Sequence, residues 1–478
     1  MSILESVKSK AVSAAVMKAY DMLCEDFDGN LPKVVAMINR FRGQGDYGNE
    51  VTLNSFNMVA EKLADREGNW RQLLDYVMAE IDPDMARLFL QNFFVNSVAI
   101  GMNRQRRVTE KHGCNVPWAI LIDPTTACNL NCVGCWAAHY EDTRHMSLTY
   151  EELDSVISQG KEMGTFIYLF TGGEPLVRKR DVIRLCEKHQ DCFFSAFTNG
   201  TLIDEAFADE MLRVKNFMPA FSIEGNREAT DARRGEGTYD KVSHAMDILR
   251  ERKLPFGASI CYTSQNYDSV TSDEFVNFLV EKGVLFAWIF TYMPIGHGAP
   301  VELLATAEQR SGMYYKVRDD WRKRVPIFFA DFWNDGEFTG GCIAGARRYL
   351  HINAAGDVEP CAFIHYSDSN IRDKSLLECY QSPLFKSYRA HQPFNCNMLR
   401  PCPLLDNPGI LSEMVRESGA KSTDYTAPES AEEAEAKCYA VAERWADASI
   451  PLWERSPKKV ISDALVAEGK SPTAWVKK

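Results

Sequence analysis

The sequence has no excess of basic residues, which argues against one large class of functions. Lys and Arg together number 54 against 66 Asp and Glu, so the formal net charge is −12. Phosphate backbones and anionic lipid surfaces are bound through a positive electrostatic field. We therefore expect no nucleic-acid partner.

Long apolar runs and a secretory signal are also absent. The most apolar stretch, residues 88–102, is interrupted by Gln91, Asn92 and Asn96, whereas a helix that spans a bilayer needs ~20 consecutive apolar residues. Residues 1–8 lack the apolar core and cleavage site of a secretory signal. We expect no transmembrane segment and a cytoplasmic protein. Its 14 cysteines are then reduced, buried or metal-bound.

The chain of 478 residues is too long for one ordinary core, and the pattern of apolar residues changes along it. Residues 1 to about 110 carry apolar side chains at helical spacing. From Trp118 onward, short strands alternate with amphipathic helices, and the expected strands are 118–122, 165–170, 192–197, 217–223, 256–262 and 285–291. Such repeats, each of roughly thirty residues, predict parallel strands with right-handed crossovers. The fold class is therefore α/β, a partial (β/α)6 TIM-like barrel whose site lies at the C-terminal ends of the strands.

Three cysteines follow the first expected strand. Cys128, Cys132 and Cys135 have the spacing C-x3-C-x2-C. Soft thiolates select iron–sulfur clusters, zinc or copper(I), and a cubane cluster normally takes four cysteines, so three would leave one iron open to a substrate. The alternatives are a zinc knuckle and three unrelated buried thiols. Zinc sites usually close with two ligand pairs, and the only nearby candidate, His139, is isolated. We favour the open iron–sulfur centre.

Glycine-containing motifs follow the next three expected strands. They are TGGEP at 171–175, TNG at 198–200 and SIEG at 222–225. Glycine lets the backbone approach a ligand closely, because no Cβ intervenes. Each motif alone is compatible with a plain turn. Their placement on successive strand ends predicts a ligand site.

With these motifs in this order, residues from about 115 to 300 resemble the radical SAM superfamily, enzymes that cleave S-adenosylmethionine (SAM) at an iron–sulfur cluster. The resemblance implies a [4Fe–4S] cluster on Cys128, Cys132 and Cys135, with the methionyl amine and carboxylate of SAM on its fourth iron. An electron from a flavodoxin- or ferredoxin-type donor would break the C5′–S bond. The resulting 5′-deoxyadenosyl radical would abstract a hydrogen from the substrate.

The resemblance also implies a set of SAM contacts, most of them at or near strand ends. They are Gly172, Gly173 and Glu174 for the amine, Ser195, Thr198, Asn199 and Ser222 near the ribose or carboxylate, Arg234 or its neighbour Arg233 at the carboxylate, and Met293, Pro294 and Gly296 beside the adenine. One position departs from the family pattern. The residue before the third cysteine is often aromatic in this family, but here it is Gly134, and Trp136 follows the cysteine as a candidate replacement.

A second group of cysteines lies downstream. Cys342 and Cys361 stand in the pattern C-x13-G-x4-C, and Cys396 and Cys402 in C-x5-C. These spacings resemble the SPASM extension, or its shorter twitch form, and imply an auxiliary [4Fe–4S] cluster on these four, with Cys396 the least secure ligand. Pro393 and Asp406 occupy places where the full pattern has further cysteines, so we expect one auxiliary cluster. A zinc ribbon and partly buried free thiols are the alternatives.

The remaining cysteines have no such spacing, and we expect most of them to pack as small hydrophobic residues. They are Cys24, Cys114, Cys186, Cys192, Cys261, Cys379 and Cys438. Asp331, Asp335 and Glu337 precede Cys342 and are candidates for a catalytic base. Solvated loop acids are the favoured interpretation of all three, so no catalytic residue is assigned.

These patterns predict five units. They are a helical N-terminal domain (1–112), a radical SAM core barrel (113–300), a connecting helix and strand (301–339), a small α+β auxiliary-cluster domain (340–410) and a C-terminal helical tail (411–478). The expected substrate is a peptide or protein side chain or a small molecule. One alternative is a non-catalytic iron–sulfur scaffold or electron carrier. Another is a radical methylase acting on RNA, which the net charge of −12 disfavours.

Overall fold

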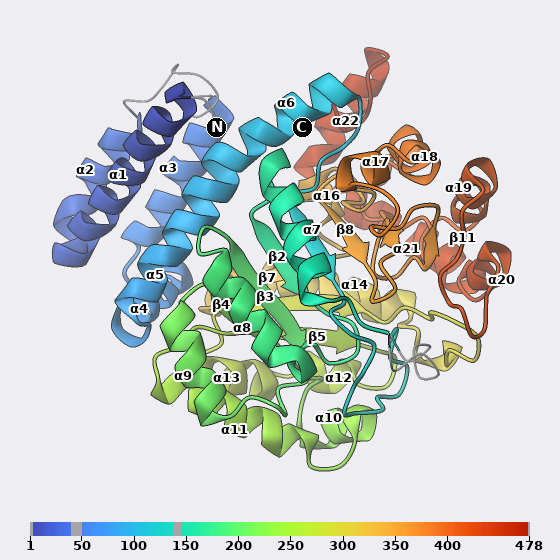
Figure 1. The fold of residues 1–478 in the computed structure, drawn as a ribbon, viewed down its shortest axis with the longest axis horizontal. Helices are drawn as coiled ribbons and strands as arrows, with labels where there is room; N and C mark the ends of the chain where they lie inside the picture. Colours follow the sequence, from blue (N-terminus) through green and yellow to red (C-terminus); the bar gives the residue numbers. More distant parts are fainter. Residues whose placement is uncertain (1–2, 40–49, 138–145, 477–478) are drawn as a thin grey trace.

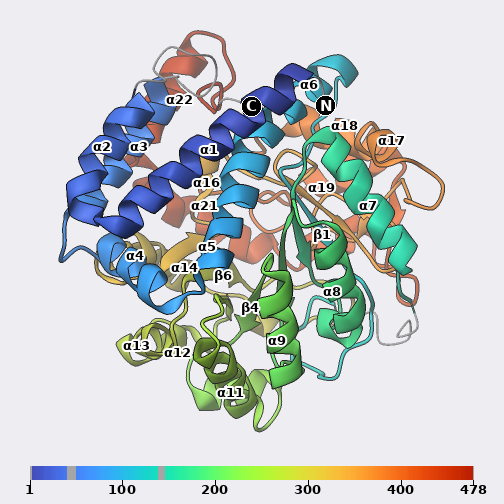
Figure 2. The same ribbon diagram turned by 60° about the vertical axis from the view of Figure 1, so that its left-hand side comes forward.

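The computed structural model describes residues 3–39, 50–137 and 146–476 (Figure 1; Figure 2). The N-terminal part is helical, as expected, and its helices line one flank of the molecule (Figure 1). Their bounds are α1 (Ile3–Glu25), α2 (Phe27–Asn39), α3 (Glu50–Ala64), α4 (Asn69–Glu80), α5 (Pro83–Phe89), the π-helix η2 (Leu90–Gly101) and α6 (Met102–His112).

The strands of the core form one twisted sheet in the order β7-β6-β5-β4-β3-β2-β1-β8-β9. All neighbours pair in parallel except β8 and β9. The bounds are β1 (Ala119–Ile122), β2 (Ile167–Phe170), β3 (Phe193–Thr198), β4 (Phe217–Ser222), β5 (Gly257–Tyr262), β6 (Phe286–Thr291), β7 (Phe328–Asp331), β8 (Tyr349–Ile352) and β9 (Val358–Glu359). The parallel partial barrel that the sequence predicts is confirmed, and β1 to β6 coincide with its expected strands.

Helices between the strands cover one face of this sheet (Figure 2). They are α7 (Tyr150–Met163), η4 (Pro175–Arg178), α8 (Lys179–Lys188), α9 (Glu205–Val214), α10 (Arg227–Arg234), α11 (Thr238–Glu251), α12 (Tyr267–Val270) and α13 (Asp273–Lys282). Thr149 and Glu152 form the expected capping box of α7, which satisfies amide groups that the first turn leaves free. Tyr168, Phe170, Phe194 and other alternate strand residues pack against these helices in the main core.

Three strands, β7, β8 and β9, extend the sheet beyond the predicted six. β7 lies next to β6, and β8 pairs in parallel with β1, so that Leu121 faces His351 across the ladder. The expected hairpin between Leu350 and Cys361 is therefore present as β8 and β9, and it continues the sheet of the barrel. Pairing between strands so distant in sequence leaves no local signal. The division into five units remains a prediction.

The C-terminal part is mainly helical and packs against the barrel (Figure 1). Its elements are η5 (Val301–Leu303), α14 (Ala307–Tyr315), the π-helix η6 (Lys316–Trp321), α15 (Arg322–Arg324), α16 (Gly336–Thr339), α17 (Leu376–Tyr380), α18 (Pro383–His391), α19 (Ile410–Ser418), α20 (Ala431–Ala436), α21 (Tyr439–Glu454), α22 (Pro457–Ala467) and the short pair β10 (Tyr366–Ser367) and β11 (Lys421–Ser422). Among the described residues, no helix is long and apolar enough to cross a membrane.

Candidate active site and auxiliary site

The face of the sheet opposite to the covering helices is apolar and partly buried. Phe197, Trp288 and Phe290 point to this face, with ring centroids 4.8 Å apart for Phe197–Trp288 and 5.6 Å apart for Phe197–Phe290. All three side chains are only half-buried, as are Ser222 and Ser259 beside them. In the described strands β1 to β6, no residue that alternates onto this face carries a charge. The barrel therefore presents an uncharged, aromatic interior.

The N-terminal helices close the far end of this interior. Phe93 of η2 lies 5.5 Å from Trp118 and 6.5 Å from Phe193 between ring centroids. These rings stand at the start of β1 and β3, away from the strand ends that carry the motifs. Access to the interior is thereby directed toward the C-terminal ends of the strands.

The three cysteines of the first motif lie together on the loop after β1. The amide of Leu130 donates to the Cys128 sulfur (3.5 Å), and the amide of Cys135 donates to the carbonyl of Cys132 (3.2 Å). Burial raises the pKa of Cys128 to about 11, with further contributions from the charges of Glu174, Cys132 and Cys135. The three sulfurs are thus close enough to interact. His139 lies outside the described residues.

The spacing of the sulfurs argues against a single zinc ion. Among the described His, Cys, Asp and Glu residues, only His391, Glu413 and Glu417 bring three ligand atoms within 4.8 Å of one another. Zinc–sulfur bonds are about 2.3 Å long, so thiolates on one zinc ion would meet that limit. Neither cysteine set does so. Ligands that bind different irons of one cluster stand farther apart, and the donor set fits an iron–sulfur cluster.

The paired glycines after β2 allow a close approach between two loops. A Cβ on Gly173 would lie 2.4 Å from the carbonyl oxygens of Thr126 and Ala127, and one on Gly172 would lie 2.7 Å from that of Thr125. The amide of Gly173 donates to the Thr125 carbonyl (3.1 Å). The glycines thus set the position of the segment that leads directly into Cys128.

Glu174, which follows β2, forms hydrogen bonds with residues at the end of β3. Its carboxylate accepts hydrogen bonds from the Thr198 hydroxyl (2.7 Å) and the Asn199 amide (2.8 Å). Burial raises the pKa of Glu174, although these hydrogen bonds oppose the shift. The Asn199 side chain donates in turn to Asn129 (2.9 Å), next to Cys128. Sequence reasoning missed Asn129, because a lone polar residue inside the cysteine motif has no distinctive spacing.

A buried carboxylate pairs with both candidate arginines. Glu224 is fully buried and accepts from Arg233 (2.7 Å) and Arg234 (2.6 Å). Burial alone would raise the pKa of Glu224, but the two guanidinium charges outweigh it and lower the pKa. Arg234 also points at the Cys132 sulfur (3.9 Å), and this contact distinguishes it from Arg233. The role of Glu224 was missed. An acid shortly before paired arginines was the available signal.

The other expected SAM contacts take different positions. Ser195 is buried on the inner face, and its hydroxyl has no hydrogen-bond partner within the described chain, whereas Ser222 is half-buried at the end of β4. Met293 and Pro294, just after β6, are buried. The carbonyl of Gly296 accepts a hydrogen bond from Lys437 (2.8 Å).

A tyrosine fills the space beside Gly134. A Cβ on Gly134 would lie 2.7 Å from the Tyr292 ring, and the backbone there has φ +65°. Trp136 points elsewhere, with its ring 5.7 Å from His351 and 5.9 Å from Phe363. The ring nearest the position of the family's usual aromatic residue is thus Tyr292, while Trp136 faces the auxiliary region.

The downstream cysteines come from separate segments. The charges of Cys342 and Cys361 both contribute, after burial, to the raised pKa of Cys402. Tyr349 bonds to the Cys361 sulfur (2.6 Å), and Tyr388 is buried beside all three thiols. The structure brings these three together but leaves Cys396 exposed.

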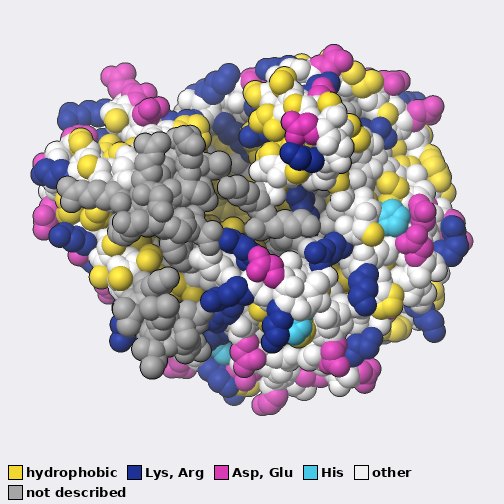
Figure 3. Space-filling model, turned by 90° about the horizontal axis from the view of Figure 1, so that it is seen from above, with side chains coloured by type: hydrophobic (Ala, Val, Ile, Leu, Met, Phe, Trp, Pro, Cys, Tyr) yellow, Lys and Arg dark blue, Asp and Glu magenta, His cyan; other side chains and the backbone are white. Residues whose placement is uncertain are grey.

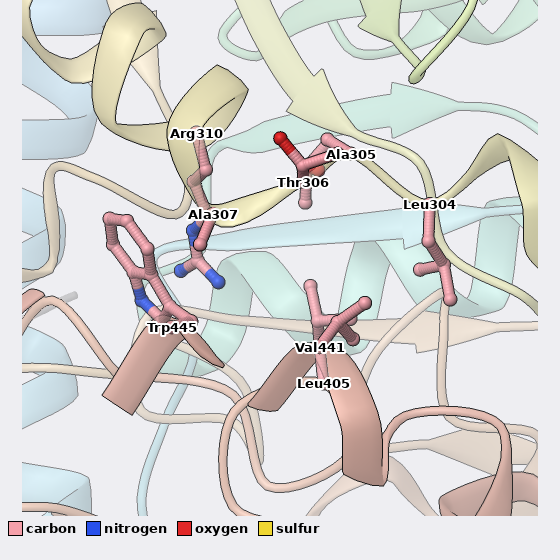
Figure 4. Close-up of a pocket in the computed structure, with 9 residues that line it drawn as sticks. Leu304, Ala305, Thr306, Ala307, Arg310, Leu405, Val441 and Trp445 are labelled. Carbon is pink, nitrogen blue, oxygen red and sulfur yellow. The ribbon is translucent and has the colours of Figure 1, made fainter. Parts of the chain in front are cut away.

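Asp406 occupies one of the places where the full SPASM pattern has a cysteine, and it has partners of its own. It is fully buried, accepts from the amide of Cys402 (2.9 Å) and pairs with Arg310. The Arg310 guanidinium lies 4.1 Å from the Trp445 ring centre in a small pocket between α14 and α21 (Figure 4). A structural ion pair therefore stands where another ligand would be.

Two of the three acids before Cys342, Asp331 and Glu337, are buried. The expectation that they are solvated loop residues is therefore wrong for these two. Asp331 is 2% exposed and Glu337 is fully buried, paired with Arg318 and Ser456. Asp335 is partly exposed and pairs with Arg322 (2.5 Å). Burial and the charge of Asp335 raise the pKa of Asp331 to about 6. Asp331 ends a strand of the central sheet, so this burial depends on a pairing that the sequence does not reveal.

The remaining cysteines mostly pack in cores, as expected, with two exceptions. Cys114, Cys186, Cys192 and Cys379 belong to the main core and Cys438 to the auxiliary core. Cys24 is exposed. Cys261 is half-buried on the inner face of β5, where its charge interacts with Arg233.

The visible surface shows no concentration of one charge. On the face in Figure 3, Lys and Arg side chains alternate with Asp and Glu over the described residues. A phosphate-binding surface needs a positive field. This face therefore gives no support for a nucleic-acid partner.

Comparisons with known proteins agree with the geometry. The Radical SAM superfamily model matches residues 122–276, and the SPASM iron–sulfur cluster-binding domain matches 342–403. An AdoMet-dependent heme synthase of Methanosarcina barkeri is 24% identical over 56% of this chain and 83% of its own. Mycofactocin maturase MftC of Mycolicibacterium smegmatis is 29% identical over 59% and 75%. Streptococcus suis SuiB, crystallised with its precursor peptide SuiA, superposes with a TM-score of 0.53 at 20% identity over 69% of this chain and 79% of its own.

A partial barrel with a three-thiol loop at its strand ends and a second thiol group beside it defines a class of iron–sulfur enzymes. The chain belongs to the radical SAM superfamily and carries a C-terminal SPASM domain. It is therefore an enzyme that uses a [4Fe–4S] cluster with SAM, together with auxiliary iron–sulfur chemistry. The scaffold alternative is not supported.

Proposed function

We propose that Cys128, Cys132 and Cys135 hold the SAM-binding [4Fe–4S] cluster. When bound, this cluster and SAM supply the 5′-deoxyadenosyl radical that abstracts hydrogen from the substrate. One observation carries the assignment. The three interacting sulfurs lie at the C-terminal strand ends, where Arg234, held by Glu224, points at Cys132.

The SAM contacts divide into two roles. Glu174 accepts hydrogen bonds from Thr198 and from the Asn199 amide, so Glu174 and Thr198 position the loops. Gly172 and Gly173 do the same through close backbone packing. The open groups are Ser195, whose buried hydroxyl has no partner in the described chain, and half-buried Ser222. Asn199 orders the cysteine loop through Asn129, and Arg234 supplies positive charge beside the cluster.

Cys342, Cys361 and Cys402 hold one auxiliary [4Fe–4S] cluster, with Cys396 as its fourth, exposed ligand. The support is the shared surroundings of the first three, with Tyr349 on Cys361 and Tyr388 beside all of them. Asp406 and its Arg310 partner fill the place of a further ligand, which favours a single auxiliary cluster.

The substrate presents an uncharged, apolar group to the barrel interior. Phe197, Trp288 and Phe290 line that interior, and an unpaired charge would lose its hydration there without a partner. Peptides and small molecules are both candidate carriers of such a group, because similar proteins include SuiB, crystallised with a precursor peptide, and a heme synthase. A flavodoxin- or ferredoxin-type protein delivers the electron, in the cytoplasm.

Anaerobic turnover tests this function. Reduced, reconstituted protein incubated with SAM is expected to release 5′-deoxyadenosine, and Cys128→Ala to release none. The matched variant Cys186→Ala removes a core thiol far from the site and is expected to retain the activity. Equal, background levels in the wild type and Cys128→Ala would contradict the proposal. Deuterium transfer from labelled peptides into 5′-deoxyadenosine then identifies the substrate class.

A further inference from the structure

A fully buried ionic triad lies between the two cysteine sets. His351 of β8 contacts Asp123, which follows β1, through Nε2 (2.8 Å), and Glu359 of β9 through Nδ1 (2.6 Å). All three side chains are completely excluded from solvent. β8 pairs with both strands, and His351 stands directly opposite Glu359 in the ladder. The sheet itself therefore assembles the triad.

The hydrogen bonds define the charge of the imidazole. A neutral ring carries one N–H, so one nitrogen would turn a lone pair toward a carboxylate. Both ring nitrogens can donate at once only in the protonated ring, and two ionised carboxylates would accept both of these hydrogen bonds. Burial alone would lower the pKa of His351, but Asp123 and Glu359 outweigh it and raise the pKa to about 10. The two acids thus favour the protonated, positively charged form of His351 in the folded protein.

Each carboxylate belongs to a segment that leads to one cysteine set. Asp123 begins the loop that carries Cys128, and the glycines after β2 pack against it, since a Cβ on Gly172 would lie 2.9 Å from the Asp123 Cβ. Glu359 precedes Cys361 by two residues, and its second oxygen is held by Thr423 and by Asn353 (3.3 Å).

The ring of Trp136 also connects the two segments that carry the cysteines. Trp136, the neighbour of Cys135, sets its ring edge against His351 and also against Phe363, two residues after Cys361. His365 stands 6.0 Å from the same ring. The His351 imidazole packs among these rings. Its two hydrogen bonds reach both segments that carry the cysteines.

Two other roles do not fit these contacts. A ligand to a metal needs a free ring nitrogen, and both nitrogens of His351 face carboxylates. A group that touches the substrate needs exposure to the barrel interior, and His351 has none. The protein keeps two carboxylates and an imidazole out of water, which is costly unless their mutual contacts are good.

We propose that His351 is a positioning residue that fixes the two cysteine sets relative to each other and places a permanent positive charge between their clusters. This inference rests on the proposed function, because it requires a cluster at each cysteine set. A positive charge stabilises a cluster more after the cluster has gained an electron. Removing the charge is expected to lower the reduction potentials of both clusters, and removing a carboxylate is expected to raise them.

The test uses reconstituted full-length protein, with both clusters titrated potentiometrically at neutral pH and followed by electron paramagnetic resonance. We expect His351→Gln to shift both midpoint potentials downward and Asp123→Asn to shift them upward. The control is His189→Gln, which breaks a partly buried His–Asp pair (His189 to Asp154, 2.8 Å) on α7 and the segment after α8. It is expected to leave both potentials unchanged.

The outcomes separate this inference from the function on which it rests. A wild type without two clusters contradicts the proposed function. A wild type with two clusters, and variants whose potentials stay unchanged or move in the same direction, overturns the role of His351. If His351→Gln takes up no iron, Asp123→Asn and Glu359→Gln carry the test, since each is expected to raise the potentials. Loss of both clusters in all three variants would show that the triad serves folding alone.

Discussion

The two cysteine sets of this protein are built in opposite ways. The barrel set lies on one loop, is partly exposed, and has a guanidinium pair beside it, balanced by the buried Glu224. The auxiliary set comes from segments as far apart as Cys342 and Cys402, and tyrosines surround it. The first arrangement leaves room for a charged ligand such as SAM. The second places tyrosines beside three half-buried thiols, which suits a group that exchanges electrons and binds no charged substrate.

The largest effect is expected from removing one auxiliary cysteine, which should separate the functions of the two cysteine sets. Cys402→Ala is expected to remove the auxiliary cluster, and with it about half of the bound iron if each cluster has four irons. It should still cleave SAM to 5′-deoxyadenosine, because the barrel loop is intact. Iron and sulfide analysis together with 5′-deoxyadenosine measurement check this. Loss of SAM cleavage in the variant would show that the sets are not independent.

The charge balance of the barrel set is open to a sharper test. Glu224→Gln leaves Arg233 and Arg234 buried with no carboxylate between them, and breaking such a pair costs about 3–5 kcal/mol. Thermal unfolding under anaerobic conditions measures the loss. The matched control is Asp240→Asn, which breaks the exposed pair with Arg227 and is expected to change the unfolding temperature much less, because water screens that pair. Equal losses of stability in the two variants would contradict the conclusion that Glu224 forms a buried ion pair with Arg233 and Arg234.

The triad between the sets predicts a pH dependence. The pKa of His351 is about 10 in the folded protein and about 6.5 when unfolded. Its stabilisation is therefore complete below pH ~6.5 and is lost as the pH rises toward 10. The difference in melting temperature between the wild type and His351→Gln should shrink across that window. A constant difference from pH 6 to pH 10 would contradict the charged imidazole.

The loop packing of the barrel set predicts a smaller effect. Gly173→Ala forces a methyl group against the carbonyls of Thr126 and Ala127, and such overpacking costs about 1–3 kcal/mol. The displaced loop carries Cys128, so the barrel cluster should be lost more readily than the auxiliary cluster during anaerobic chelation. Equal loss from both clusters would show that the effect is global.

The smallest effect is expected at the most exposed thiol. Cys396→Ala should lower the auxiliary iron content less than Cys402→Ala, because Cys396 is exposed and the other three thiols are not. Spectroscopy of the auxiliary cluster in both variants makes the comparison. An equal loss in the two variants would show that Cys396 is as important a ligand as the three partly buried cysteines.

Much of the fold and the barrel site follows from local patterns. The strands β1 to β6, the capping box at Thr149 and the motifs at the strand ends all depend on residues close in sequence. What the sequence did not reveal depends on distant pairing. The place of β8 beside β1, the burial of Asp331 and the triad of His351 each depend on segments that are distant in sequence; Asp123 and His351, for example, are 228 residues apart. The Glu224 pair was missed although its partners lie close in sequence, because an acid shortly before paired arginines is a weak signal on its own.

The parallel pairing of β8 with β1 has a consequence for how the protein can be divided. A chain cut before residue 340 would expose the hydrogen-bonding groups of β1 along its full length, and an unpaired edge of this kind invites aggregation. The same cut would leave Asp123 buried without its cation. The SPASM segment is thus not a detachable module, and shortened versions of this enzyme should be made by trimming from the N-terminal flank.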